Sequence, residues 1–348
     1  MISVACGDGQ TIALTASGEV WGWGCYKDKE GKKFFNPSPG VQNPVKDIKK
    51  QQNEPIKITG LPPIVEIACG SSFCLALCST GRVYSWGLGE CGELGRRVGP
   101  LKVKGLNADG EEDMIYDLPA ILNQHLTPQL MRVSTSGGRE ASDQGMPIET
   151  VKTIGCGSYH SLVVTIGGKA FSCGLNNYGQ LGLVTGTGTD EDTESRPLLQ
   201  EMSFFRDVPL LIVSGGVHHS LVLTADHRLF AFGRGDSGQL GAPQMEGKSA
   251  GAFSSQPLPV PLPASDKGAN VVTFSCGGNH NLVLLSNKDV YSWGYGDMLA
   301  LGHGDERDEN MPRRLNFSKS KIGNISVTKV AGGGQHSALI GEVLSTSK

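Results

Sequence analysis

The chain has 348 residues, with 31 basic and 34 acidic side chains and a formal net charge of -3. This near balance excludes a broad electrostatic surface for nucleic acid or an anionic membrane. No apolar run reaches the roughly 20 residues that span a bilayer, and the chain opens without a charged leader, so we expect a soluble intracellular protein. The 49 glycines indicate many tight turns.

A repeat unit begins at the start of the chain. Its first half is an apolar stretch, a small residue followed by Gly, two variable residues, often a His, and a second apolar stretch, which predicts two strands around a bend. Its second half is a third apolar strand and a Gly-rich turn. The units span residues 3–24, 65–95, 151–182, 211–241, 272–302 and, in part, 327–340.

The repeat predicts an all-β fold, a β-propeller of four-stranded antiparallel blades forming a single domain over residues 1–348. The bend glycines recur about every sixty residues with one wider gap, the scale of a blade with its loops. The runs are rich in β-branched and aromatic residues and lack a helical period, which disfavours an α-solenoid. The units comprise five complete copies and one partial copy. We therefore expect either a missing N-terminal portion or a ring that is open or closed by fewer blades.

The first unit departs from the others after its third strand. Where the others carry a Gly-x-x-Gly-x-Leu-Gly turn, residues 25–35 read Cys-Tyr-Lys-Asp-Lys-Glu-Gly-Lys-Lys-Phe-Phe. Charges crowded around one glycine between aromatic flanks predict a projecting hairpin. A charged hairpin is compatible with a plain solvated surface element or with a binding element, and the residues alone leave both open.

Three further segments interrupt the repeats. The long insertion at residues 96–150 is expected to be functional or disordered, because structureless loops of this length are uncommon inside compact domains. The acidic piece from Thr185 to Glu194 and the Pro-rich piece from Ser254 to Pro263 are interpreted as flexible connections.

No motif for covalent chemistry is present in the sequence. It contains no Cys-x-x-Cys pair, His-Glu-x-x-His or phosphate-binding Gly-x-x-x-x-Gly-Lys-Ser/Thr. We expect no enzyme activity, no cofactor and no metal. Cys69, Cys74 and Cys78 fall in one apolar strand pair and are predicted to be reduced and buried.

The repeat consensus, together with the hairpin, resembles the regulator of chromosome condensation family, which includes the exchange factors of the small GTPase Ran. The resemblance covers essentially the whole chain, and the family is a seven-bladed propeller. Trp23-Gly24 with Tyr26-Lys27-Asp28 and Gly31 matches the position and pattern of the family's β-wedge. The resemblance assigns six residues to the wedge here: Lys27, Asp28, Lys29, Glu30, Gly31 and Lys32.

The resemblance also implies contacts with a partner from one face of the propeller. The residues carried over by position are Asp8, Arg96, Asn177, His218 and His336. Ser72 and Asn36 depart from the family, since exchange factors carry an aspartate and a glutamate at these positions. This puts the efficiency of exchange in doubt.

Most histidines of the repeat have a structural interpretation. His160, His219, His280 and His336 recur in register, which favours a hydrogen bond bracing each bend. His218 precedes its register histidine and is expected to point elsewhere.

The resemblance implies a guanine-nucleotide exchange factor for a Ran-type small GTPase, found in the nucleus or otherwise in the cytoplasm. A non-exchange adaptor or scaffold with the same repeat is the alternative, favoured by Ser72 and by the loss of acidic positions. A plant ultraviolet-B photoreceptor would need clustered Gly-Trp-Arg-His repeats, which are absent. Chromatin contact has thin support, because only Arg96, Arg97, Lys102 and Lys104 are basic before an acidic run.

Overall fold

The computed structural model describes residues 1–106, 110–135, 142–183, 195–247, 249–263, 268–317 and 325–343. The chain divides into two compact units, each described by itself. The first comprises Met1–Ile166, Phe171–Leu175 and Ser195–Gln200, and the second comprises Gly167–Ala170, Asn176–Glu194 and Glu201–Lys348. A single propeller domain over the whole chain stays a prediction.

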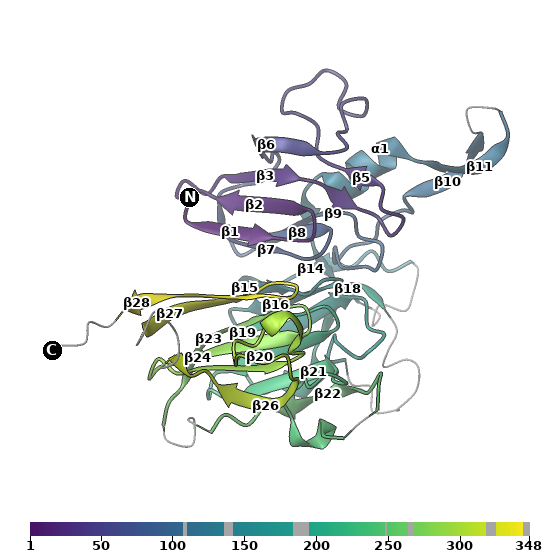
Figure 1. The fold of residues 1–348 in the computed structure, drawn as a ribbon. Helices are drawn as coiled ribbons and strands as arrows, with labels where there is room; N and C mark the ends of the chain where they lie inside the picture. Colours follow the sequence, from purple (N-terminus) through teal and green to yellow (C-terminus); the bar gives the residue numbers. More distant parts are fainter. Residues whose placement is uncertain are drawn as a thin grey trace. The chain divides into compact units, whose positions relative to one another are not determined.

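Antiparallel sheets make up the first unit (Figure 1). The first sheet has the order β1-β2-β3-β6 and the second β12-β9-β8-β7. The third sheet has the order β14-β13-β18-β17-β16-β15, in which β13 and β18 alone run parallel. The strands are β1 (Ser3–Cys6), β2 (Gln10–Leu14), β3 (Val20–Gly24), β6 (Gln52–Lys57), β7 (Ile64–Cys69), β8 (Phe73–Cys78), β9 (Val83–Gly87), β12 (Gln129–Leu130), β13 (Arg132–Val133), β14 (Met146–Pro147), β15 (Val151–Cys156), β16 (His160–Thr165), β17 (Ala170–Gly174) and β18 (Arg196–Glu201).

The second unit continues the pattern with sheets β19-β20-β21-β22, β23-β24-β25-β26 and the two-stranded β27-β28. The predicted blades and the partial last repeat are therefore present. The strands are β19 (Leu210–Gly215), β20 (His219–Thr224), β21 (Leu229–Arg234), β22 (Phe253–Pro259), β23 (Val271–Cys276), β24 (His280–Leu285), β25 (Val290–Gly294), β26 (Glu309–Arg314), β27 (Ile325–Gly332) and β28 (Ser337–Val343).

The interpretation of the Pro-rich piece as a flexible connection is wrong for its first part. Residues 254–259 lie in β22, which pairs with β21 through Phe230 opposite Pro259 and Ala231 opposite Leu258. β22 is the outer strand of its sheet, and an outer strand tolerates proline because its free edge needs no donor. The acidic piece from Thr185 to Glu194 lies outside the described residues.

The second strand of each blade forms much of its buried core. β8, β16, β20 and β24 are buried along their whole length, because each lies in the middle of its sheet and has an apolar centre. The third strand then ends in a glycine. At Gly87, φ is +111°, and a Cβ atom would lie 2.4 Å from the carbonyl oxygen of Ser72. Only glycine fits where the chain turns this close to the bend.

A recurring hydrogen bond joins each regular turn to the sheet that follows it. The residue after the register position donates its side chain to a turn carbonyl of the preceding blade. The four bonds are Ser161 Oγ to Glu93 O (2.6 Å), Ser220 Oγ to Gln180 O (2.8 Å), Asn281 Nδ2 to Gln239 O (2.8 Å) and Ser337 Oγ to Ala300 O (2.7 Å). These buried bonds fix neighbouring blades against each other.

The register histidines also join blades. His219 Nε2 lies 2.8 Å from Asn281 Oδ1, and His280 Nε2 lies 3.0 Å from Ser337 Oγ. Burial lowers the pKa of both imidazoles to about 4, so both are neutral at pH 7. The prediction of structural hydrogen bonds is confirmed for these two histidines. In both cases the bond reaches the next sheet and therefore joins two blades.

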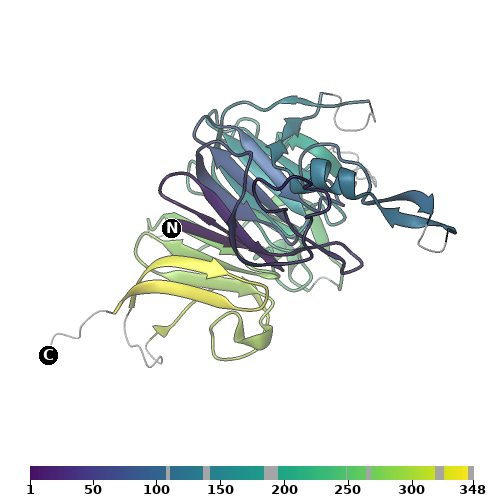
Figure 2. The ribbon, with the colours of Figure 1, turned by 90° about the horizontal axis from the view of Figure 1, so that it is seen from above.

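The long insertion is folded over most of its length. It contributes β12 to the second sheet and β13 and β14 to the third, and it also forms β10 (Lys102–Leu106), β11 (Glu112–Tyr116), α1 (Leu118–Ala120) and the π-helix η1 (Ile121–Leu126). β10 and β11 form a separate two-stranded sheet that extends away from the rest of the first unit in both views (Figures 1 and 2). The remaining short elements are β4 (Tyr26–Lys27), β5 (Lys33–Phe34), η3 (Ser203–Phe205), η4 (Pro243–Met245) and η6 (Asp297–Leu299).

Candidate functional site

The predicted hairpin between the third and fourth strands of the first blade is present, formed by β4 and β5 with Tyr26 opposite Phe34 and Lys27 opposite Lys33. We call residues 27–32 the wedge. Asp28 organises its turn, since its Oδ1 atom accepts hydrogen bonds from the backbone of Glu30 (3.0 Å) and Lys32 (2.7 Å). The sequence folds locally in this way because an aspartate side chain can cap its own turn.

The base of the wedge is anchored by one aromatic residue. Tyr26 is fully buried, its ring stacks on Phe35 with centroids 5.4 Å apart, and its hydroxyl accepts a 2.8 Å hydrogen bond from Trp86 Nε1. In the second unit the matching indole, Trp293, donates instead to the turn carbonyl of Gln239. The Tyr26 hydroxyl therefore takes the place of the carbonyl that a regular turn would supply.

Of the two residues predicted to depart from the family pattern, Ser72 contacts the wedge and Asn36 contacts the insertion. Ser72 Oγ donates to the carbonyl of Lys27 (2.7 Å) and accepts from the amide of Lys27 (3.1 Å). Asn36 Nδ2 donates to the carbonyl of Leu126 at the end of η1 (2.6 Å). An ionised aspartate or glutamate has no hydrogen to donate, so neither carboxylate could make these bonds to a carbonyl.

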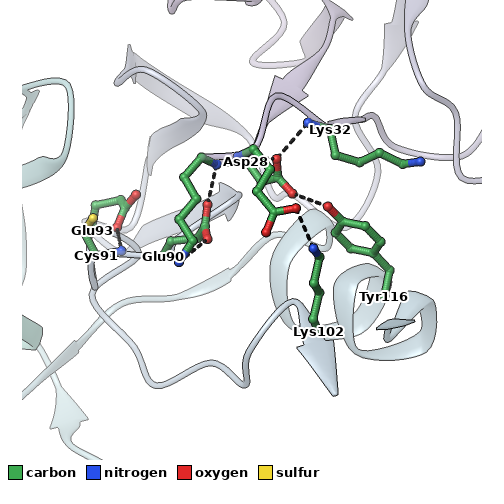
Figure 3. A network of polar contacts seen from close by, with 9 residues as sticks. Asp28, Lys32, Glu90, Cys91, Glu93, Lys102 and Tyr116 are labelled. Carbon is green, nitrogen blue, oxygen red and sulfur yellow. Dashed lines mark hydrogen bonds and ion pairs between the residues drawn. The ribbon is translucent and has the colours of Figure 1, made fainter. Parts of the chain in front are cut away.

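The tip of the wedge is held by side chains from other parts of the first unit (Figure 3). The Tyr116 hydroxyl, at the end of β11, donates to Asp28 Oδ2 at 2.7 Å. Lys102, at the start of β10, pairs with Glu30 Oε2 at 2.5 Å. Glu90 Oε2, in the turn after β9, accepts from the Lys29 amide at 2.9 Å.

Electrostatics support this arrangement of the tip. Desolvation and the hydrogen bond to Asp28 raise the pKa of Tyr116 to about 12, so its hydroxyl stays a donor at neutral pH. The Lys102 ammonium lies 4.8 Å from the centroid of the Tyr116 ring. Asp28 is buried, whereas Lys27, Lys29 and Lys32 are exposed. The wedge therefore turns a carboxylate inward and presents cations to solvent.

A cavity of about 480 Å³ lies between the wedge and the insertion. His125 of η1 lines it, with Nε2 at 3.0 Å from the carbonyl of Gly99, and burial lowers the pKa of this imidazole. The other lining residues are Asp28, Lys29, Glu30, Gly89, Glu90, Val98, Gly99, Pro100, Leu101, Lys102, Met114 and Tyr116.

The structure brings two of the predicted partner residues together in the second unit. Asn177 is exposed and accepts a 3.0 Å hydrogen bond from Gln180 at its Oδ1 atom. The His218 ring is half-buried, with its centroid 5.0 Å from that of Tyr178. Desolvation and the nearby Arg234 lower the pKa of His218. Arg234 also lies over the Tyr178 ring at 5.3 Å, so these four residues form one surface cluster.

The other three predicted partner residues differ in their exposure to solvent. Asp8 is exposed in the bend after β1, and His336 is exposed in the bend between β27 and β28. Arg96 is only 5% exposed, and its Nη1 atom donates to the carbonyl of Gln124 (2.5 Å). The structure thus gives Arg96 an internal role in holding the insertion, and its contact with a partner stays a prediction.

Sequence reasoning missed the residues that hold the wedge tip. Tyr116 and Lys102 lie in the insertion, outside every repeat, and no repeat position marks them. The run Lys-Val-Lys-Gly-Leu at 102–106 and the run Glu-Asp-Met-Ile-Tyr at 112–116 do read as two short strands. That signal could have located a hairpin, but not the contact between this hairpin and the wedge.

Comparison with known proteins agrees with the fold. The family model of the RCC1-like domain matches residues 1–339. Protein pim1 of Schizosaccharomyces pombe is 28% identical over 97% of this chain and 54% of its own length, and the guanine nucleotide exchange factor SRM1 of Saccharomyces cerevisiae is 28% identical over 99% and 63%. The chain thus spans little more than half the length of these curated relatives.

A solved structure is similar to this chain as well. It is that of Prp20p from Saccharomyces cerevisiae, described together with its binding properties to Gsp1p and histones. It is 24% identical, with a TM-score of 0.76 over 99% of this chain and 69% of that one. The repeated four-stranded sheets and this likeness define a β-propeller. The match over residues 1–339 identifies the family, and the chain belongs to the RCC1-like domain family.

Proposed function

We propose that this protein is a guanine-nucleotide exchange factor for a small GTPase of the Ran type, acting in the nucleus. The observation that carries the proposal is the wedge, which stands where the other blades have a regular turn. The name of the relative SRM1 records an exchange factor, and that relative aligns over 99% of this chain. Family membership supports the scaffold, and the wedge supports the activity.

The mechanism needs no covalent step. A partner that binds the empty GTPase more tightly than the nucleotide-bound form lowers the affinity of the GTPase for nucleotide. Bound nucleotide lowers the affinity of the GTPase for the partner by the same factor. Lys27, Lys29 and Lys32 would act as cations beside the phosphate-binding region, where they compete with Mg²⁺ for the acidic groups of the GTPase that hold it. The cluster around Asn177 and His218 would contribute to holding the GTPase.

Release of labelled GDP from Ran tests the proposal with a shortened wedge. Replacing residues 28–32 by Asn-Gly joins Lys27 to Lys33 through a two-residue hairpin turn, which keeps the β4–β5 pairing and the Tyr26 anchor. We expect the natural chain to accelerate release by at least about a hundredfold and the shortened chain to lose most of it, since about 3 kcal/mol of differential binding corresponds to that factor. A natural chain that gives no acceleration contradicts the proposal.

A non-exchange adaptor of the same fold is the second candidate, favoured by Ser72 and Asn36. By the family resemblance, exchange factors carry a carboxylate at each of these two positions. In this structure, both donate to backbone carbonyls instead. Stable binding of Ran without faster GDP release, measured in the same experiment, would support the adaptor.

Chromatin binding is not part of the proposal. Of the basic residues that open the insertion, Arg96 is buried, Arg97 Nε donates to the carbonyl of Asp143 (2.6 Å) and Lys102 is paired with Glu30. Cations that are buried or already bonded within the chain contribute little to binding a phosphate backbone.

A further inference from the structure

The β10–β11 hairpin contacts the tip of the wedge. The first residue pair of its register, Lys102 opposite Tyr116, supplies two of the side chains that reach the wedge tip. Further out, the same face carries Lys104 opposite Met114 and Leu106 opposite Glu112, which are exposed. In the described part of the hairpin, the side chains that bond to the wedge come from its base.

The wedge has little of its own to fix its conformation. β4 and β5 are two residues each, and a short isolated hairpin is marginally stable in water. A Cβ atom at Gly31 would meet nothing within 4 Å, so the tip packs against no core. Asp28 closes the turn through one carboxylate oxygen, and the other oxygen accepts from Tyr116. The orientation of Asp28 thus depends on the insertion.

We propose that the β10–β11 hairpin is a brace that fixes the wedge in the conformation used for exchange, with Tyr116 and Lys102 as its positioning residues. The inference rests on the proposed function for its effect on exchange, but the brace itself is a property of the free protein. A preordered wedge spares the complex the cost of ordering it on binding. Neither residue needs to touch the GTPase.

Amide hydrogen exchange of the free protein tests the brace directly. The probes are the amides of Glu30 and Lys32, which donate to Asp28. Tyr116→Phe removes the hydroxyl donor and keeps the ring, and we expect these two amides to exchange about threefold to tenfold faster, as the loss of one hydrogen bond implies. Lys102→Met breaks an exposed ion pair and should have a smaller effect of about twofold.

Lys104→Met is the matched control. Lys104 lies on the same strand and face as Lys102, and in the described ranges it has no hydrogen bond or ion pair with the wedge. It should leave both amides and the unfolding midpoint unchanged, whereas Tyr116→Phe should lower the midpoint only slightly, as the loss of one hydrogen bond implies. Wedge amides that exchange at the natural rate in Tyr116→Phe would overturn the brace.

GDP release from Ran gives a second, separate readout. We expect Tyr116→Phe to lower the maximal release rate threefold to tenfold while the GTPase concentration at half-maximal rate changes little. A faster release would overturn the proposal, because the hairpin would then restrain the wedge instead of ordering it. If the natural chain releases no GDP, the proposed function fails while amide exchange still decides the brace.

Discussion

The segment after the third strand takes two forms in this protein, a regular turn and the wedge. In the regular turn, a leucine is buried and the next blade donates a side chain to a backbone carbonyl, as Asn281 does to Gln239. After β3 the side-chain donor from the next blade is Ser72, which bonds to the carbonyl of Lys27, and Cys74 stands at the position that donates in the other blades. Its Sγ atom lies 3.8 Å from the Tyr26 hydroxyl.

The comparison shows how a repeat protein can free one loop for function. A regular turn is fixed by the packing and the blade joint that every repeat shares. The wedge lacks this shared packing, and other contacts hold it: an aromatic anchor and Ser72 at its base, and polar contacts from Glu90 and the insertion at its tip. Its base should therefore matter for stability, and its tip should matter for activity.

The largest expected effect is at the base. Tyr26→Ala removes a fully buried aromatic ring and should lower the free energy of unfolding by about 3–5 kcal/mol. Tyr26→Phe keeps the ring but leaves the buried Trp86 N–H without its acceptor, and should cost about 1–3 kcal/mol. Denaturant unfolding measures both, and a cost below about 0.5 kcal/mol for Tyr26→Ala would show that the anchor is not needed.

The next prediction compares the same repeat position in two contacts between neighbouring blades. Asn281→Ala deprives His219 of its partner and the Gln239 carbonyl of a donor, so we expect a loss of about 2–3 kcal/mol. Cys74→Ala beside the wedge breaks no joint to a turn and should cost about 1 kcal/mol. Equal losses in denaturant unfolding would mean that the wedge joint is as strong as a regular one.

The smallest effect concerns a carboxylate in a regular turn. Glu93 Oε2 accepts from the Cys91 amide at 2.7 Å, whereas Gln180 and Gln239 make the same bond to the amides of Tyr178 and Ser237. Burial raises the pKa of Glu93 from 4.5 to about 8. The folded chain therefore holds an extra proton between these values, and stability falls as pH rises through that window.

Glu93→Gln should remove this pH dependence. We expect a gain of about 1–3 kcal/mol at pH 8.5 and almost none at pH 4.5, because the natural carboxyl is then neutral in the folded chain. Thermal unfolding at the two pH values checks the prediction. A gain that is the same at both would show that charge on Glu93 is not its cause.

The sequence was sufficient for the repeated part of the fold and for the existence of the wedge. Each blade repeats the same apolar runs and glycines, so the pattern is read several times over, and the hairpin at residues 25–35 stood out as a break in it. The contacts between neighbouring blades could be predicted only in part. The histidines were in register, but a register does not tell which neighbouring sheet their side chains reach.

The support of the wedge could not be predicted because it is a long-range contact made by residues outside the repeat. Asp28 and Tyr116 are 88 residues apart in the chain, and nothing local in either segment specifies the other. Arg96 illustrates a related limit. Its position marks it as a turn residue, but only the folded insertion shows that its guanidinium is covered.

The central claim is that the wedge releases nucleotide, and one measurement tests it most directly. Labelled GDP release from Ran is followed with the natural chain and with the chain whose residues 28–32 are replaced by Asn-Gly, at equal concentration and after both show the same unfolding midpoint. The account predicts fast release with the natural chain and near-basal release with the shortened one. Equal release by the two chains would contradict it.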